Sequence, residues 1–429
     1  MPAPDPAQTV LDTVLDMFSL ENRNDPYPFY HAARELGPLV ATPFDVHLVT
    51  GHDDCMTVLS DPRWGHGYSA GISPIRPGVV AENIPGSFIR MDPPDHTRLR
   101  GLVSKAFTPR AMERLRPLVE RTAERAVASA LAAAEFDLVA DLAATVPITV
   151  ICELLGVPIE DHPRFDTWVR ALARGLDPDP LLAEDELRGR EIAAAAFSEY
   201  FRGLVAERRA RPGPDLISQL ATIDDAGDRL TETELQDICV LLLFGGYETT
   251  VHMTGNMVLA LSRHPDQLNL LRERPDLIPS AVDELLRFDP PVHFTNRVAL
   301  QERHLAGRDF GRGEAVVILV AGANRDPRVF PDPDRLDVTR FAGPTPAPRH
   351  LAFGLGIHFC LGAQLARLEL EIVLTTLLRH AHAFAVLDPE PTYRETLTIR
   401  GLQSLRVRLE GSRAPDLPRT TQSATRTAP

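Results

Sequence analysis

A cysteine preceded by two closely spaced glycines is the first feature of this sequence that could do chemistry. Residues 353–362 read FGLGIHFCLG, and an apolar helical pattern follows. Cys360 therefore lies near a predicted helix start, where free backbone N–H groups and the helix dipole favour a thiolate. Gly354 and Gly356 would let the backbone pass close to a flat or bulky group. A lone cysteine here is more often a packed core residue, but the glycines and His358 favour a ligand-binding loop.

An acid and an alcohol stand side by side in the most apolar helical stretch of the chain. The sequence GGYETT places Glu248 and Thr249 just after two glycines, Gly245 and Gly246. Glycines inside a helix cost about 1 kcal/mol each relative to alanine, and a kink or bulge at a functional site would be a reason to keep them. Close helix packing explains a glycine pair equally well. A neighbouring carboxyl and hydroxyl group are suited to proton transfer.

Two charged pairs have the spacing of one helix face. Glu284 and Arg287 in DELLR lie at positions i and i+3, and His96 and Arg100 in DHTRLR lie at i and i+4. Taken alone, each pair is more often a solvated surface feature than part of a site. Their meaning depends on what surrounds them.

The cysteine segment FGLGIHFCLG closely resembles the haem-binding loop of cytochromes P450, in which a phenylalanine, two glycines and a cysteine recur at these spacings. The resemblance implies that Cys360 is the axial iron ligand of a haem b and that Phe353 packs beside its sulfur. His358 would reach a haem propionate, and Gly354 and Gly362 would leave room for the porphyrin. The resemblance covers the chain up to its C-terminal tail.

The acid–alcohol pair takes on a role within the same resemblance. Thr249 would hydrogen-bond the dioxygen that is being reduced, while Glu248 would relay protons to it from solvent. Gly245 and Gly246 would lie against the cofactor. The resemblance therefore implies oxygen activation in addition to haem binding.

The charged pairs also take on roles by resemblance. Glu284 and Arg287, followed by Arg335 in PDRL, resemble the buried Glu–Arg–Arg network of the family, whose role is structural. Buried propionates need cationic or hydrogen-bonding partners. The residues implied for that task are His96, Arg100, Arg297 in TNRVAL, and His358.

Helical patterns dominate the elements that must position these residues. Apolar residues recur at helical spacing over 109–134 and 191–210, and a third pattern over 231–265 opens with TETE, which resembles a capping box. Strand patterns are short and lie at 38–44, 46–51, 315–324 and 405–409. A Pro- and Asp-rich segment, 324–343, predicts an irregular meander. We expect a mainly α protein with small β-sheets. The resemblance implies the P450 fold, with haem between the central long helix and the cysteine-bearing helix.

One domain accounts for most of the chain, because no repeat or linker divides it. We expect an N-terminal extension over residues 1–20 and a single domain over 21–411. Residues 412–429 are rich in Ser, Thr, Pro and Arg and nearly free of large apolar residues, which predicts a disordered tail.

Composition excludes several classes of function. The 429 residues carry a formal net charge of -14, so neither nucleic acid nor an anionic membrane surface is an expected partner. The four cysteines are far apart, which argues against a disulfide framework or a structural zinc site. Residues 1–30 have neither a basic region nor a long apolar core, so no signal peptide is predicted. We expect a cytoplasmic monomer.

A basic island interrupts the acidic chain around residues 98–125 and includes Lys105, Arg110 and Arg114. By resemblance, this segment lies on the side where electron donors dock, so we expect an acidic ferredoxin there, served by a ferredoxin reductase. An ordinary mixed-charge helix face is the alternative. No flavin or iron–sulfur segment is recognisable, so electrons would come from these separate proteins.

The expected function is a haem-thiolate monooxygenase that uses O2 to hydroxylate or epoxidise a hydrophobic small molecule of secondary metabolism. By resemblance the substrate pocket is formed by loop 66–89, the helices within 163–205, and Leu242, Val292, His293, Phe294, Thr295 and Ile399. Oxidative coupling or cyclisation is an alternative outcome in the same class. A peroxide-driven enzyme or a non-catalytic haem-based sensor would not need Glu248 and Thr249.

Overall fold

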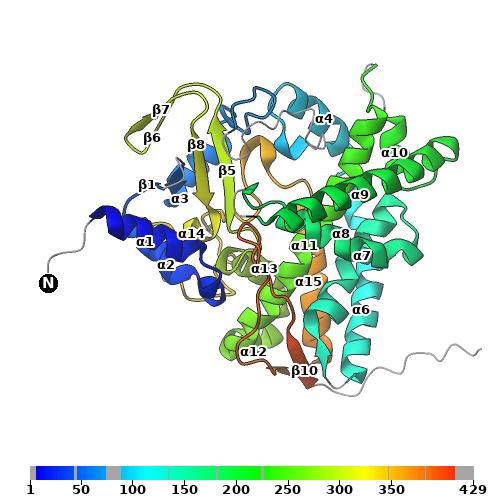
Figure 1. Ribbon diagram of the computed structural model, residues 1–429. Coiled ribbons are helices and arrows are strands. Elements are labelled where there is room, and N and C mark those ends of the chain that lie inside the picture. The colour runs from blue at the N-terminus through cyan, green and yellow to red at the C-terminus, as the bar shows by residue number, and fades with distance from the viewer. Residues whose placement is uncertain are drawn as a thin grey trace, which may run out of the picture.

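The computed structural model describes residues 6–42, 46–73, 88–133, 135–179, 182–223, 227–345, 347–381 and 383–410. Figure 1 shows a helical body beside a smaller part built on a sheet. The α-helices are α1 Pro6–Phe18, α2 Tyr27–Glu35, α3 His52–Ser60, α4 Asp95–Ser104, α5 Pro109–Glu113, α6 Arg116–Ala132, α7 Thr145–Leu155, α8 His162–Arg174, α9 Glu184–Ala210, α10 Leu216–Thr222, α11 Glu232–Arg263, α12 Pro265–Glu273, α13 Ile278–Phe288, α14 Val320–Ala323 and α15 Ala363–His380. The strands are β1 Leu39–Ala41, β2 His47–Val49, β3 Trp64–Gly65, β4 Phe136–Asp137, β5 Phe294–Ala299, β6 Arg303–Leu305, β7 Arg308–Phe310, β8 Ala315–Leu319, β9 Ala383–Val386 and β10 Arg406–Glu410.

The largest sheet has five strands in the order β1-β2-β8-β5-β3. β2 and β8 are parallel, whereas β5 runs antiparallel to both β8 and β3. Helix α1 packs on this sheet, because Val14 and Met17 are buried in one cluster with Leu48 and Phe294. The described part of segment 1–20 is therefore integrated with the domain through apolar contacts.

Helix α11 forms the centre of the helical body (Figure 1). Its 32 residues correspond to about 48 Å of helix at 1.5 Å per residue. At its start, the Thr231 hydroxyl accepts from the Glu234 amide at 3.2 Å and the Glu234 carboxylate accepts from the Thr231 amide at 2.8 Å. This is the capping box predicted from TETE. Most α11 side chains are buried, in one large apolar cluster with residues of α6, α7, α9, α13 and α15.

The predicted elements are found, with differences at their ends and in the sheets. The 109–134 pattern is divided into α5 and α6 by a turn at Arg114–Leu115. In the 315–324 pattern, strand β8 ends at Leu319 and the short helix α14 follows. Strands β3 to β7 and β9 were not predicted, because each is only two to six residues long and lacks a clear alternation of apolar and polar residues. Within the described residues of 324–343, the chain after α14 contains no further helix or strand, as expected.

One segment within the described residues, Leu138–Leu155, is long and apolar enough to cross a membrane by length and composition alone. It comprises a six-residue π-helix, Leu138–Ala143, and helix α7. Because 56% of this window is buried inside the protein, packing in the core accounts for its apolar character. The predicted tail, 412–429, lies outside the described residues.

Candidate cofactor and catalytic site

Cys360 lies between a 3-10 turn, Gly356–His358, and the start of α15. Its amide donates to the Phe353 carbonyl at 2.9 Å, which closes the loop. Burial raises the pKa of the Cys360 thiol, and the Gly362 amide and nearby arginines offset this only in part. The expected thiolate stabilisation by the helix start is therefore outweighed by desolvation. A metal cation on the sulfur would supply the missing charge.

The glycines of the loop serve different needs. Gly354 and Gly356 both have φ of +66°, a conformation that side chains rarely adopt. A Cβ on Gly356 would also lie 2.4 Å from the Leu59 carbonyl oxygen, so this glycine lets the loop cross the end of α3 rather than a flat ligand. At Gly362, by contrast, a Cβ would meet nothing within 4 Å among the described residues. Gly362 therefore faces open space beside Cys360, as a site for a flat group requires.

A cluster of cationic and imidazole side chains lies beside the cysteine loop. The rings of His96, from α4, and His358 are 4.3 Å apart, and Arg297, from β5, is 5% exposed. None of the ring nitrogens of His96 and His358 has a hydrogen-bond partner among the described residues, although all are buried. Arg100, also from α4, donates to the Phe359 carbonyl of the cysteine loop.

Burial dominates the electrostatics of this cluster, and Asp92 is the carboxylate that acts on Arg297. Burial, with Arg100 and Arg297 nearby, lowers the pKa of His96 to about 4. Burial likewise lowers the pKa of Arg297 to about 10, opposed only by the charge of Asp92. Buried cations without partners are costly, so a buried anion belongs here. The two propionates of a haem fit this donor set, and the cluster unites the four residues predicted for them.

His66 also belongs to this cluster, although the sequence predicted it only as part of the pocket loop 66–89. Its ring lies 4.8 Å from that of His358, at an angle of 82°. In the sequence it lies within a glycine-rich turn with no recognisable motif. Its position follows only from the pairing of β3 with β5, which brings residue 66 next to the strand of Arg297.

The middle of α11 carries the acid–alcohol pair. Helix α11 runs through Gly245 and Gly246 as one α-helix, Glu232–Arg263. A Cβ on Gly246 would lie 3.1 Å from the Ile151 side chain, which identifies this glycine with close packing against α7. A Cβ on Gly245 would meet no atom of the described residues within 4 Å, so this side of the helix faces open space. The Thr249 hydroxyl donates to the Gly245 carbonyl at 2.7 Å.

Glu248 is held by two residues that sequence reasoning missed. Its Oε1 accepts from Arg394 at 2.7 Å and from Nε2 of His252 at 2.9 Å, and the residue is 1% exposed. Nδ1 of His252 is buried and has no hydrogen-bond partner in the part of the chain that the structure describes, so we assign the ring proton to Nε2. Gly401 makes room for this ring, because a Cβ there would lie 1.8 Å from Nδ1.

The two partners keep Glu248 ionised. Burial raises the pKa of this carboxyl, but His252 and the charge of Arg394 outweigh burial and hold the pKa below its ordinary value. The i, i+4 spacing of Glu248 and His252 could have indicated this pair. Arg394 is 146 residues away in sequence, and no local pattern connects it to Glu248.

The Glu–Arg–Arg network is present, but its third member was predicted wrongly. Arg287 donates to both carboxylate oxygens of Glu284, at 2.7 and 2.9 Å, and both side chains are fully buried. Arg340, not Arg335, is the second arginine on this carboxylate, at 3.1 Å. The side chain of Arg335 is exposed, and only its backbone carbonyl joins the network, accepting from Arg287 and Arg340.

The predicted substrate-pocket residues divide into two groups. Leu242 is on α11, and Val292 and Ile399 are joined in a β-bridge, with Thr295 nearby on β5. His293 is fully buried, with Nδ1 at 2.8 Å from the Tyr30 hydroxyl and Nε2 at 3.8 Å from Asp289. Its predicted contact with substrate is therefore corrected to a structural role.

Phe294 likewise packs away from a pocket. Its ring contacts those of Phe18 and Tyr30, at 5.1 and 5.7 Å between centroids, and it is 5% exposed. Of the predicted pocket loop 66–89, residues 74–87 lie outside the described residues. The predicted helices within 163–205 are α8 and α9.

The basic residues predicted to face a redox partner are exposed. Lys105 caps the end of α4, Arg110 lies in α5 and Arg114 follows it. α4 also provides Arg100, which reaches the cysteine loop. The basic residues thus lie on elements that adjoin the loop.

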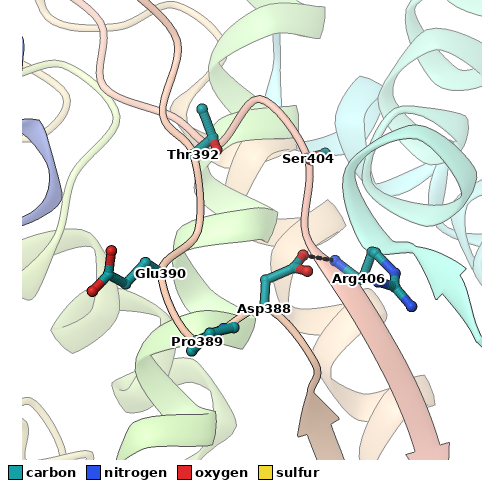
Figure 2. Close-up of a pocket in the computed structure, with 6 residues that line it drawn as sticks. All are labelled: Asp388, Pro389, Glu390, Thr392, Ser404 and Arg406. Carbon is teal, nitrogen blue, oxygen red and sulfur yellow. Dashed lines mark hydrogen bonds between the residues drawn. The ribbon is translucent and has the colours of Figure 1, made fainter.

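Two surface hollows lie elsewhere. One, of about 280 Å³, lies where the Asp388 carboxylate accepts from the Arg406 amide (Figure 2). Another, of about 600 Å³, lies between α6 and α15 and is lined by residues such as Arg121, Arg125 and Arg379. Neither is lined by the candidate site residues.

Comparisons with known proteins agree with this geometry. Residues 74–395 match the family model described as Cytochrome P450. The chain is 40% identical to the cytochrome P450 monooxygenase PikC of Streptomyces venezuelae, over 93% of this chain and 95% of the relative. It is also 40% identical to the vitamin D(3) 25-hydroxylase of Pseudonocardia autotrophica, over 91% and 96%. The crystal structure of P450BioI in complex with an acyl carrier protein ligated to hexadec-9Z-enoic acid has a TM-score of 0.83 and 34% identity, with 91% and 99% covered.

Proposed function

The chain belongs to the cytochrome P450 family, and we propose that it hydroxylates or epoxidises a hydrophobic small molecule, using O2 and electrons from a ferredoxin. The observation that carries this proposal is the pair of Glu248 and Thr249 beside the open side of Gly245. A carboxylate buried in an apolar helix is costly, and here it is retained together with two partners that orient it.

We assign the haem to the space between α11 and the cysteine loop, with Cys360 as its iron ligand. Four residues would hold the propionates: His96, Arg100, Arg297 and His358. When bound, a thiolate-ligated haem activates dioxygen so that one oxygen atom can be transferred to a C–H bond or an alkene. The chain supplies the ligand, the orientation and the protons.

Proton delivery is assigned to specific atoms of α11. Oε1 of Glu248 is occupied by Arg394 and His252. No hydrogen bond to Oε2 occurs among the described residues, so Oε2 is the atom that can take a proton from water. The Thr249 hydroxyl would accept that proton through solvent and donate its own toward the open side of Gly245. For that it must leave the Gly245 carbonyl, to which it now donates.

The substitution Thr249→Ala tests this assignment. We expect NAD(P)H to be consumed with less product and more hydrogen peroxide, because protons reach the reduced oxygen without control of their position. Thr250→Ala, at the neighbouring buried position on α11, is the matched control and should keep the coupling of the unmodified enzyme. Equal coupling in the Thr249→Ala variant would remove Thr249 from the relay.

Electron supply is assigned to a separate ferredoxin and ferredoxin reductase. The exposed residues Lys105, Arg110 and Arg114 support docking of an acidic donor, since the rest of the chain is strongly acidic. We expect Arg110→Glu with Arg114→Glu to slow reduction by ferredoxin, and high salt to slow reduction of the unmodified protein. Arg188→Glu, at an exposed position on α9, is the control. Reduction rates that do not depend on ionic strength would contradict this surface.

The substrate is assigned to the class of hydrophobic intermediates of secondary metabolism, in a protein that acts in the cytoplasm as a monomer. The relatives named above, among them a hydroxylase, support this class. Leu242, Val292, Thr295 and Ile399 remain the proposed pocket residues. Candidate ligands can be ranked by the spin-state change that each causes in the haem spectrum.

Labelled dioxygen separates oxygen insertion from oxidative coupling. With 18O2, we expect one labelled oxygen atom in the product of each turnover. A product that contains no label, formed by joining two carbon centres or by closing a ring, would replace insertion by coupling. A protein that binds ligands but consumes no NAD(P)H with its redox partners would instead be a sensor.

A further inference from the structure

The turn that follows strand β3 presents an imidazole to the cluster around Arg297. In the antiparallel pairing of β3 with β5, Gly65 lies opposite Val298. His66, the residue after the end of β3, therefore lies beside Arg297, the residue before Val298. This register brings a histidine into the cluster from an element that carries none of the expected cofactor ligands.

A carboxylate fixes the backbone of this turn. Oδ1 of Asp92 accepts from the His66 amide at 2.7 Å, and Oδ2 accepts from the Gly67 amide at 2.8 Å. Gly65 has no space for a side chain, because a Cβ there would lie 2.2 Å from Oδ1 of Asp92. Gly67 has φ of +70°, which favours glycine. The position of the His66 ring is therefore set by a rigid backbone.

The neighbours of His66 that carry positive charge are Arg297 and Arg90. Burial lowers the pKa of His66 well below its ordinary value, and Arg297, His358, Arg90 and His96 lower it further. The carboxylate of Asp92 is already engaged by the two backbone amides. No hydrogen bond to the His66 ring occurs among the described residues. A neutral imidazole still has one N–H to donate.

The neighbouring histidines also have ring nitrogens that could bind an anion. The ring nitrogens of His96 and His358 are buried and have no partner within the described ranges, and His66 packs edge-on against His358 at 4.8 Å between ring centroids. Three imidazoles and the guanidinium of Arg297 thus lie together, and among the described residues the Asp92 carboxylate that acts on Arg297 is engaged by two backbone amides. An anion with several acceptor oxygens would satisfy all of them.

We propose that His66 is an additional propionate-binding residue, which donates a hydrogen bond to a haem propionate alongside His358 and Arg297. This inference rests on the proposed function, because it needs the haem in that space. The proposal explains why Asp92 accepts from the His66 and Gly67 amides and why residue 65 is a glycine. The four expected propionate residues explain neither feature.

Two substitutions separate hydrogen bonding from packing. His66→Phe keeps an aromatic ring against His358 but removes the donor, whereas His66→Gln keeps a donor and removes the ring. His304→Gln is the control, since His304 is exposed and paired with Asp309 on the β6–β7 hairpin. The measured quantities are the rate of haem transfer from each holoprotein to excess apomyoglobin and the midpoint potential of the haem.

We expect His66→Phe to lose haem roughly tenfold faster, as for one hydrogen bond to a charged group, and to shift the midpoint potential. His66→Gln should stay close to the unmodified protein, and His304→Gln should match it. Haem loss that is unchanged in His66→Phe, or that is faster in His66→Gln than in His66→Phe, would overturn the proposal. If the unmodified protein does not hold haem through a thiolate, the proposed function fails instead, and its ferrous–CO spectrum shows this separately.

Discussion

Two buried arginines define two regions of opposite character in this protein. Arg287 donates to both oxygens of Glu284 and to the carbonyls of Asn324, Pro333 and Arg335. Arg297 is buried almost as completely, yet its hydrogen bonds among the described residues go only to the Asn296 carbonyl and, at 3.5 Å, the Thr295 hydroxyl.

The difference separates architecture from function. A buried cation whose donors are all used completes a network within the chain, so the Glu284 network has a structural role. A buried cation with spare donors, surrounded by imidazoles that lack partners, is completed from outside. We therefore propose the region around Arg297 as the ligand site, whereas the contacts of Arg287 hold together the segment that leads to the cysteine loop.

Removing Arg287 should have the largest effect. Arg287→Met leaves the buried Glu284 carboxylate with Arg340 as its remaining cation, beside the Asp337 amide, and we expect about 3–5 kcal/mol less free energy of unfolding. The loss should be similar with and without haem, because the network does not depend on the cofactor. Urea denaturation of both forms measures it. A loss confined to the haem-bound form would place this network in the ligand site.

Removing Arg297 should have opposite effects on the two forms. Arg297→Met removes an incompletely paired buried cation, so the haem-free protein should become more stable, by about 2 kcal/mol. The haem-bound protein should release its haem faster, because a propionate loses its partner. Denaturation of the haem-free protein and haem transfer to apomyoglobin measure the two effects. Destabilisation of the haem-free protein would mean that Arg297 is satisfied by the chain itself.

Arg394→Met tests the buried pair of Glu248 and Arg394 through the pH dependence of the free energy of unfolding. The folded-state pKa of Glu248 is depressed, so its contribution to stability is complete above the unfolded value of about 4.3 and is lost as pH falls through the folded value. We expect the substitution to cost about 1–2 kcal/mol at pH 7 and less near pH 4. Denaturation at the two pH values measures this. An equal cost at both would show that Arg394 does not depress the pKa of Glu248.

Separate alanine substitutions of Arg340 and Arg335 test the corrected network, and the smallest effect on stability is expected for Arg335→Ala. Arg340→Ala should cost about 1–2 kcal/mol, since this side chain donates to Glu284 and to the carbonyls of Pro331, Asp332 and Arg335. Arg335→Ala, at an exposed position, should stay within about 0.5 kcal/mol of the unmodified protein. Thermal unfolding of both variants decides between them, and the reverse order would restore Arg335.

The sequence alone could predict features formed by residues that are neighbours in the chain. The loop of Cys360, the pair of Glu248 and Thr249 and the cap at Thr231 are local patterns, and the structure contains each as a local unit. Arg335 and Arg340 lie in the same irregular meander, so only the path of the backbone decides which one reaches Glu284.

Residues that meet through the fold could not be predicted in this way. His293 and Phe294 lie at an expected pocket position, but α1 and α2 cover them, and that contact is recorded in no local pattern. Arg394 and His66 reach the site through the C-terminal segment and through strand pairing. Their roles could be proposed only from the contacts that the fold gives their side chains.

The central claim is that Cys360 holds the iron of a haem whose propionates complete the Arg297 cluster. The most direct test is the absorption spectrum of the reduced protein under carbon monoxide, compared with that of Cys360→Ser. We predict the red-shifted Soret band of thiolate ligation in the unmodified protein and its loss in the variant. A band typical of histidine ligation in the unmodified protein, or a red-shifted band that persists in Cys360→Ser, would contradict the account.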